Sequence, residues 1–155
     1  MSVQAAVIQQ YRTIVNRAAR HSGPHASVPP EGWIATVRKA LGMSGQQLAK
    51  RLGVTRARVS RAERAEREGG TTIRTMHAMA EAMGCRFVYA IVPEGRIEDV
   101  IAAQARRKAQ ALTGRASSHM ALENQSLSEE QNAKAVERAV QNLLHTMPAD
   151  LWTEK

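Results

Sequence analysis

Apolar residues recur three and four positions apart in several stretches of the chain, and short polar or glycine-containing breaks separate these stretches. That spacing is the period of one face of an α-helix. One further run is instead rich in β-branched and aromatic residues, which favours a strand. We therefore expect helices at 3–20, 33–41, 45–52, 56–68, 73–83, 96–113 and 128–147, and a single short strand at 86–92.

Two of the expected helices are short and follow each other closely. Ser44 is a good N-cap for the first, and Thr55 is a good N-cap for the second. Gly53 stands between them, where a residue with positive φ is needed to end a helix. The apolar positions are Leu48, Ala49 and Leu52 on the first helix, and Val59 and Ala62 on the second. The pattern predicts two helices joined by a tight turn.

The second of these helices is strongly basic, with five arginines and no acid before Glu63. If Val59 and Ala62 point inward, the arginines lie on the outer face and its flanks. A basic helix presented in this way suits the major groove of DNA, although a charged helix face can also be merely solvated. The predicted contacts are Arg56, Ser60 and Arg61 to base edges, and Thr55, Arg58 and Arg64 to phosphates.

These residues resemble those of the bacterial Xre family, whose domains are phage-repressor-like helix-turn-helix bundles. The matching positions are Ser44, Leu48-Ala49, Leu52-Gly53-Val54-Thr55, Val59-Ser60 and Glu63. The resemblance implies that the helix with Val59 is the recognition helix and that Glu63 pairs with Arg38. Gly45 departs from the family, which often has glutamine there.

The charge of the chain favours an anionic partner. The formal net charge is +8, and residues 31–74 hold ten basic side chains against four acidic ones. Residues 1–30 carry three arginines and no acid, whereas 116–155 hold three basic and six acidic side chains. Aromatic residues make up only 3% of the chain, too few to stack on single-stranded nucleic acid. Duplex DNA is the expected partner of the basic part.

The expected strand, 86–92, has no second comparable run to pair with in this chain. A lone strand leaves its backbone groups unpaired, so the same strand of a second copy is the simplest partner. The result is a homodimer that reads a palindromic operator. The predicted dimerisation residues are Phe87, Val88, Tyr89 and Ile91. The competing arrangement packs the strand on its own domain, with the N-terminal arm at its edge.

The sequence predicts a mainly α fold in three segments. Residues 1–30 form a helical arm with a proline-rich linker, 31–93 the helix-turn-helix domain with its dimerisation strand, and 94–155 a helical partner-binding region. Arg106-Arg107-Lys108 either contact flanking phosphates or form a solvated face. The apolar stripe of the last helix is buried either within the chain or against a partner protein.

Most of the chain beyond the arm also resembles the proteins called mobile mystery protein A. The carrying residues are Gly32-Trp33-Ile34, Arg38 to Met43, Gly84 to Pro93 and Met120 to Glu123. The resemblance implies an antitoxin and repressor, encoded beside a Fic-domain AMP-transferase. Fic inhibitors carry a helical motif that ends in Glu and then Gly or Asn. Glu123-Asn124 match its end, with His119 in place of the first Ser or Thr, and are the predicted partner-binding residues.

No pattern for catalysis, metal binding or a cofactor is present: the five histidines are scattered, and no phosphate-binding glycine loop occurs. A single cysteine, Cys85, is expected to be a buried small hydrophobe in a reducing, cytoplasmic setting. No apolar run suits a membrane. We expect a non-enzymatic, operator-specific repressor that is also an antitoxin. The alternatives are an antitoxin acting only through protein binding and a nonspecific DNA-coating protein.

Overall fold

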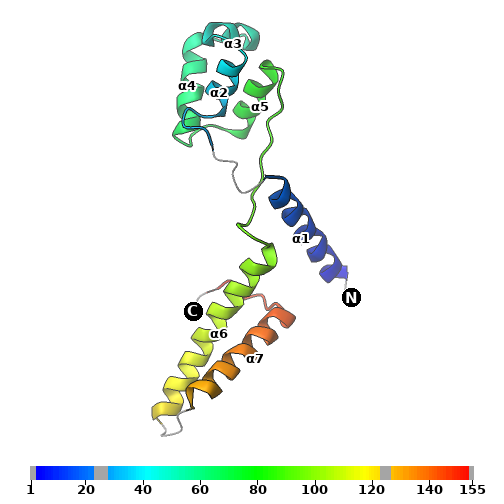
Figure 1. Cartoon of the computed structure of the whole chain (residues 1–155), viewed down its shortest axis with the longest axis vertical. Helices are drawn as coiled ribbons and strands as arrows, with labels where there is room; N and C mark the ends of the chain where they lie inside the picture. Colours follow the sequence, from blue (N-terminus) through cyan, green and yellow to red (C-terminus); the bar gives the residue numbers. More distant parts are fainter. Residues whose placement is uncertain (1–2, 23–27, 123–126, 154–155) are drawn as a thin grey trace. The chain divides into compact units, whose positions relative to one another are not determined.

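The computed structural model describes residues 3–22, 28–122 and 127–153, and the regular structure within these ranges is helical (Figure 1). The contacts divide the chain into two compact units: residues 24–90, and residues 1–23 together with 91–155. The helices are α1 (Val3–Ser22), α2 (Trp33–Ala40), α3 (Gly45–Leu52), α4 (Arg56–Arg67), α5 (Ile73–Ala82), α6 (Ile97–Leu122) and α7 (Glu129–Thr146). The mainly helical fold is therefore confirmed.

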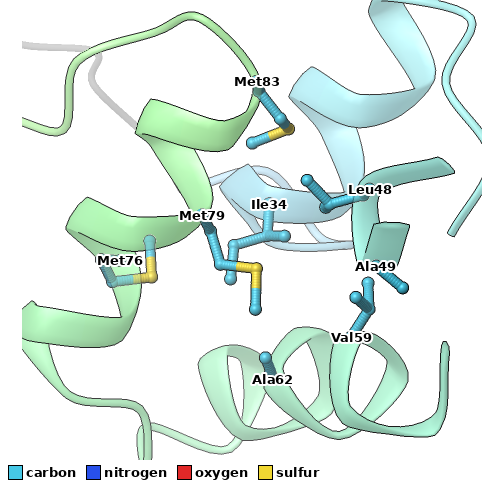
Figure 2. Packing of buried hydrophobic residues seen from close by; sticks show 8 residues of the cluster. All are labelled: Ile34, Leu48, Ala49, Val59, Ala62, Met76, Met79 and Met83. Atoms are coloured by element: carbon cyan, nitrogen blue, oxygen red, sulfur yellow. The ribbon is translucent and has the colours of Figure 1, made fainter. Parts of the chain in front are cut away.

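The unit of residues 24–90 is a bundle of α2, α3, α4 and α5 around one apolar core (Figure 2). Ile34, Leu48 and Val59 are at most 2% exposed, and each such side chain contributes roughly 1.5–3 kcal/mol by leaving water. The rest of the cluster is Ala49, Ala62, Met76, Met79 and Met83. Met76 and Met79 of α5, and Met83 directly after it, are therefore core residues.

Three large apolar residues at the ends of these helices are about half exposed, although their spacing places them on the apolar face. Trp33 is 44%, Ile73 50% and Leu41 51% exposed. Trp33 and Ile73 are the first residues of their helices, and Leu41 directly follows α2. Helical periodicity gives the face of a residue but not how far along the axis the neighbouring helices extend.

In the other unit, α6 and α7 pack against each other as a hairpin. Ala105 and Ala109 of α6 are fully buried, and these small side chains let α7 approach closely. The other buried members of this core are Ile101, Val140, Leu143 and Leu151. The apolar stripe of the last helix is thus covered within the chain. The helix expected to end at 113 continues to Leu122, because a single glycine at 114 does not break a helix otherwise rich in alanine.

The helix α1 contacts α6 through one asparagine. The Asn16 side-chain oxygen accepts a hydrogen bond from the Ile97 backbone N–H at 2.9 Å, and the Asn16 amide donates to Glu98 at 2.9 Å. The first contact satisfies a free donor at the start of α6. The second lowers the pKa of the Glu98 carboxyl, because the hydrogen bond favours its charged form. This contact ties the beginning of the chain to the helical hairpin.

Residues 86–92 form no strand within the described part of the chain, so the expected strand is not confirmed. Their backbone makes no hydrogen bond to any described residue. Phe87 packs against the core of the bundle, whereas Val88 is 70% and Ile91 95% exposed. The expectation that Cys85 is buried was wrong: Cys85 is exposed. Residues 84–86, which follow α5, are all exposed, and the chain returns to the core only at Phe87.

Candidate nucleic-acid interface

The turn between α3 and α4 is defined by local contacts. Ser44 and Gln47 form a capping box at the start of α3, in which the Ser44 hydroxyl accepts from the Gln47 N–H at 3.1 Å. Gly53 ends α3 with φ of 68°, a left-handed conformation that favours glycine. The Thr55 hydroxyl then accepts from the Arg58 N–H at 3.2 Å and caps α4. All three expected helix ends are confirmed.

The inner face of α4 packs against the bundle. Val59 is 1% and Ala62 9% exposed, and Figure 2 shows both directed from α4 into the apolar core, with Val59 beside Ala49 of α3. This orientation was expected from their spacing and is confirmed. Because the helix is fixed at these two positions, the residues on its other side are directed away from the core.

The six residues predicted to contact DNA are all exposed. They are Thr55, Arg56, Arg58, Ser60, Arg61 and Arg64. None of the four arginines among them forms an ion pair or a side-chain hydrogen bond with any described residue. Their guanidinium groups therefore keep their donors for an external acceptor, and planar guanidinium donors match phosphate and guanine acceptors.

The acidic residues of α4 point the other way and are bound by α2. Arg38 Nε donates to Glu63 at 2.7 Å, and each of the two side chains is 14% exposed. This is the pair that the family resemblance implied. Arg38 also donates to the Met43 carbonyl at 2.9 Å, which ties the end of α2 to the start of α3. Glu63 thus holds α4 against the bundle and adds no charge to the outer face.

A second acid of α4, Glu66, was not predicted from the sequence to have a role. Its carboxylate accepts from the backbone N–H of Trp33 at 2.6 Å and of Ile34 at 2.9 Å. The only signal in the sequence was indirect: α2 begins after Gly32, which has no side chain with which to cap the helix. The acidic and basic side chains of α4 are therefore on different sides of the helix: two carboxylates are bound by α2, and the arginines are directed outward.

The basic cluster of α6 is engaged within its own unit. Arg106 pairs with Glu137 of α7 at 3.3 Å, and Lys108 pairs with Asp150 at 2.9 Å. Arg107 donates to the Gln104 side chain at 2.6 Å. Arg106 and Lys108 join α6 to α7 and to the residues after it, whereas the contact of Arg107 lies within α6. They are less available for phosphates than the arginines of α4.

The remaining predicted sites have different outcomes. Glu123 and Asn124 lie outside the described residues. Among the dimerisation residues, Phe87 and Tyr89 stack with ring centroids 5.8 Å apart, and His77 of α5 meets Phe87 edge-on at 5.3 Å. Within the described ranges, no group of acids, histidines or cysteines is arranged to hold a metal ion, and no helix is long and apolar enough to cross a membrane.

Residues 34–89 match the model of the helix-turn-helix family. The matched range includes nearly all of α2 and the whole of α3, α4 and α5, as well as the segment that holds Phe87 and Tyr89. Neither a curated protein nor a solved structure matches the chain. The match supports an Xre-like helix-turn-helix domain in this part of the chain and, with it, a DNA-binding transcription regulator.

Proposed function

We propose that this chain, which carries a DNA-binding helix-turn-helix domain, is a sequence-specific repressor that reads duplex DNA with the outer face of α4. The observation that carries the proposal is the separation of acidic and basic side chains onto different sides of that helix. Glu63 and Glu66 are bound by α2, while Arg58, Arg61 and Arg64 are exposed and unpaired among the described residues. Such a face attracts phosphates and presents donors to base edges.

The roles of the individual residues follow from their positions on α4. Arg61 and Ser60 lie opposite or beside the buried face, and Arg56 stands in the first turn, where recognition helices meet base edges. Arginine binds the two acceptors of guanine in a bidentate way. Thr55 and Arg58 stand beside the free N–H groups of the first turn, which favour phosphate. We assign Arg56, Ser60 and Arg61 to bases, and Thr55, Arg58 and Arg64 to phosphates.

A titration of the ¹⁵N-labelled full chain with duplex DNA tests this interface. The probe is a duplex of about 24 base pairs, long enough for two half-sites one helical turn apart, selected from a random pool by the chain itself. We expect the largest amide shifts at 55–64, with little change at 129–146 of α7. Shifts confined to residues outside α4 contradict the proposed interface.

We further infer that the repressor acts as a homodimer joined through residues 86–92. Phe87 and Tyr89 lie on one side of the segment, as alternate residues of an extended chain do, and their rings contact His77. The backbone of the segment is unpaired among the described residues, and Val88 and Ile91 are exposed. The same segment of a second copy supplies the missing partner and doubles the recognition helices, which fits a palindromic operator.

The resemblance to mobile mystery protein A supports a second role, as the antitoxin of a Fic-type AMP-transferase. In this proposal Glu123 and Asn124, which directly follow α6, bind the partner, and Glu123 pairs with an arginine of its active site. The chain then represses its own operon and neutralises the toxin. The alternative is an antitoxin that acts by protein binding alone, with incidental DNA affinity.

The antitoxin role is tested with the Fic-domain protein encoded beside this chain. We expect the full chain to co-purify with it and to suppress its AMP transfer, and we expect Glu123→Ala to abolish the suppression while DNA binding is unchanged. Glu129→Ala, at an exposed acid of α7, is the matched control. Equal suppression by wild type and Glu123→Ala removes Glu123 from the mechanism.

A further inference from the structure

The start of α2 is capped by a residue from another helix. The first N–H groups of an α-helix have no partner inside the helix, and a side chain at the N-cap position usually binds one of them. Gly32, the N-cap of α2, has no side chain to do so. Instead the two carboxylate oxygens of Glu66 accept from Trp33 at 2.6 Å and from Ile34 at 2.9 Å. A negative charge here also interacts favourably with the helix dipole.

Gly32 makes room for this cap. A Cβ atom at position 32 would lie 2.7 Å from the nearer Glu66 carboxylate oxygen and 2.9 Å from the carboxylate carbon. Gly32 also has φ of 81°, which favours glycine over residues with a side chain. The two residues therefore form one unit, here called the Glu66 clasp: Glu66 with Gly32 and the N–H groups of Trp33 and Ile34.

We propose that Glu66 is a positioning residue for DNA recognition, because the clasp fixes the C-terminal end of α4. Val59 and Ala62 hold the helix through the core, and Glu63 holds it through Arg38. Glu66 adds a third attachment nearer the C-terminus of α4. It lies about 7.5 Å along the helix axis from Arg61, at 1.5 Å per residue. Release of this end lets α4 tilt about its inner contacts, and the tilt moves the base-reading side chains.

The proposal rests on DNA recognition by α4. A positioning role of Glu66 is distinguished from a role in fold stability alone by its effect on the selectivity for DNA sequence. Loss of folded protein lowers binding to every duplex in the same proportion. A misplaced helix instead loses base contacts, which need precise placement, more than phosphate contacts. The quantity that reports positioning is thus the ratio of affinities for a selected duplex and for a scrambled one.

The experiment compares full-length wild type with Glu66→Gln, Gly32→Ala and Glu68→Gln. The probes are the duplex selected by the wild type and a duplex of the same composition in scrambled order, measured well below the lowest melting temperature. Glu68→Gln is the matched control, because Glu68 follows α4 directly, is exposed and carries the same charge. It corrects for the weaker repulsion of DNA when an acid is removed.

We expect the affinity ratio to fall about tenfold in Glu66→Gln, the effect of losing one charged hydrogen bond. The affinity ratio of Gly32→Ala should also fall, because the methyl group of the new alanine occupies the place of the Glu66 carboxylate. Glu68→Gln should keep the wild-type ratio. Amide exchange at Trp33 and Ile34 should be faster in Glu66→Gln than in the wild type and unchanged in Glu68→Gln.

The other outcomes contradict defined parts of the proposal. Suppose that the wild type prefers the selected duplex to the scrambled one, and that Glu66→Gln has the same affinity ratio as Glu68→Gln. The clasp then does not position α4, although α4 still reads DNA. Faster exchange at Trp33 and Ile34 with an unchanged ratio also rejects positioning and leaves Glu66 a structural cap. If the wild type itself fails to discriminate, the proposed function falls together with the clasp. A Gly32→Ala variant that does not fold leaves the decision to Glu66→Gln.

Discussion

Replacing Val88 and Ile91 together by lysine is expected to dissociate the homodimer and to weaken binding to the selected duplex by about 10²–10⁴-fold, the usual gain from linking two binding modules. The two side chains are 70% and 95% exposed, so the substitutions should leave the bundle folded. In a ribbon of two such segments, the new charges face like charges across the strands and oppose pairing. Sedimentation gives the oligomeric state, and a titration of labelled duplex gives the affinity.

The charge of this variant requires a matched control. Val3→Lys with Ile14→Lys adds the same two charges at exposed apolar positions of α1, which are 83% and 63% exposed. Added positive charge by itself strengthens attraction to DNA, so a loss of affinity in the first variant reports loss of pairing. A control that dissociates while the variant at 88 and 91 stays dimeric places the dimer contact on α1 and contradicts the proposed ribbon.

Arg61→Ala is expected to weaken binding to the selected duplex by about 1–3 kcal/mol, the loss of one bidentate contact with a guanine. Arg61 is exposed and makes no ion pair with the described residues, so its removal should leave the melting temperature unchanged. Fluorescence anisotropy with the labelled duplex measures the loss. An affinity equal to that of the wild type rejects a base contact by Arg61.

Arg58→Ala is the companion variant, because Arg58 is assigned to a phosphate. Arg58 lies on the same helix as Arg61, and its replacement removes the same charge. The variant should weaken binding to the selected and the scrambled duplex by the same factor. The slope of log affinity against log salt concentration should also fall by about one, since one phosphate contact is lost. Identical behaviour of the two variants contradicts the division of roles between them.

Features that depend on neighbouring residues alone followed from the sequence. Ser44 and Thr55 cap the expected helices because the contact lies within four residues of the cap. The inward face of α4 followed from the spacing of Val59 and Ala62. The pair of Arg38 and Glu63 followed from resemblance to a family, since no local rule brings residues so far apart in sequence together.

Contacts between distant helix ends did not follow from the sequence. Glu66 caps α2, and Asn16 caps α6, but a lone acid or amide on a helix face gives no sign of which helix begins beside it. The burial of Cys85 was misjudged for a similar reason, because apolar neighbours in sequence do not enclose a residue in the exposed turn that follows a helix. The strand at 86–92 stays a prediction, because a lone segment has no ladder to join within one chain.

The most direct test of the central claim, that the outer face of α4 reads base sequence, is selection from a random duplex pool by wild type and Arg61→Ala in parallel. We expect the wild type to select an inverted repeat, and Arg61→Ala to select the same repeat with one position per half-site relaxed and all others kept. Two identical selection profiles, or no preferred sequence for the wild type, contradict the claim.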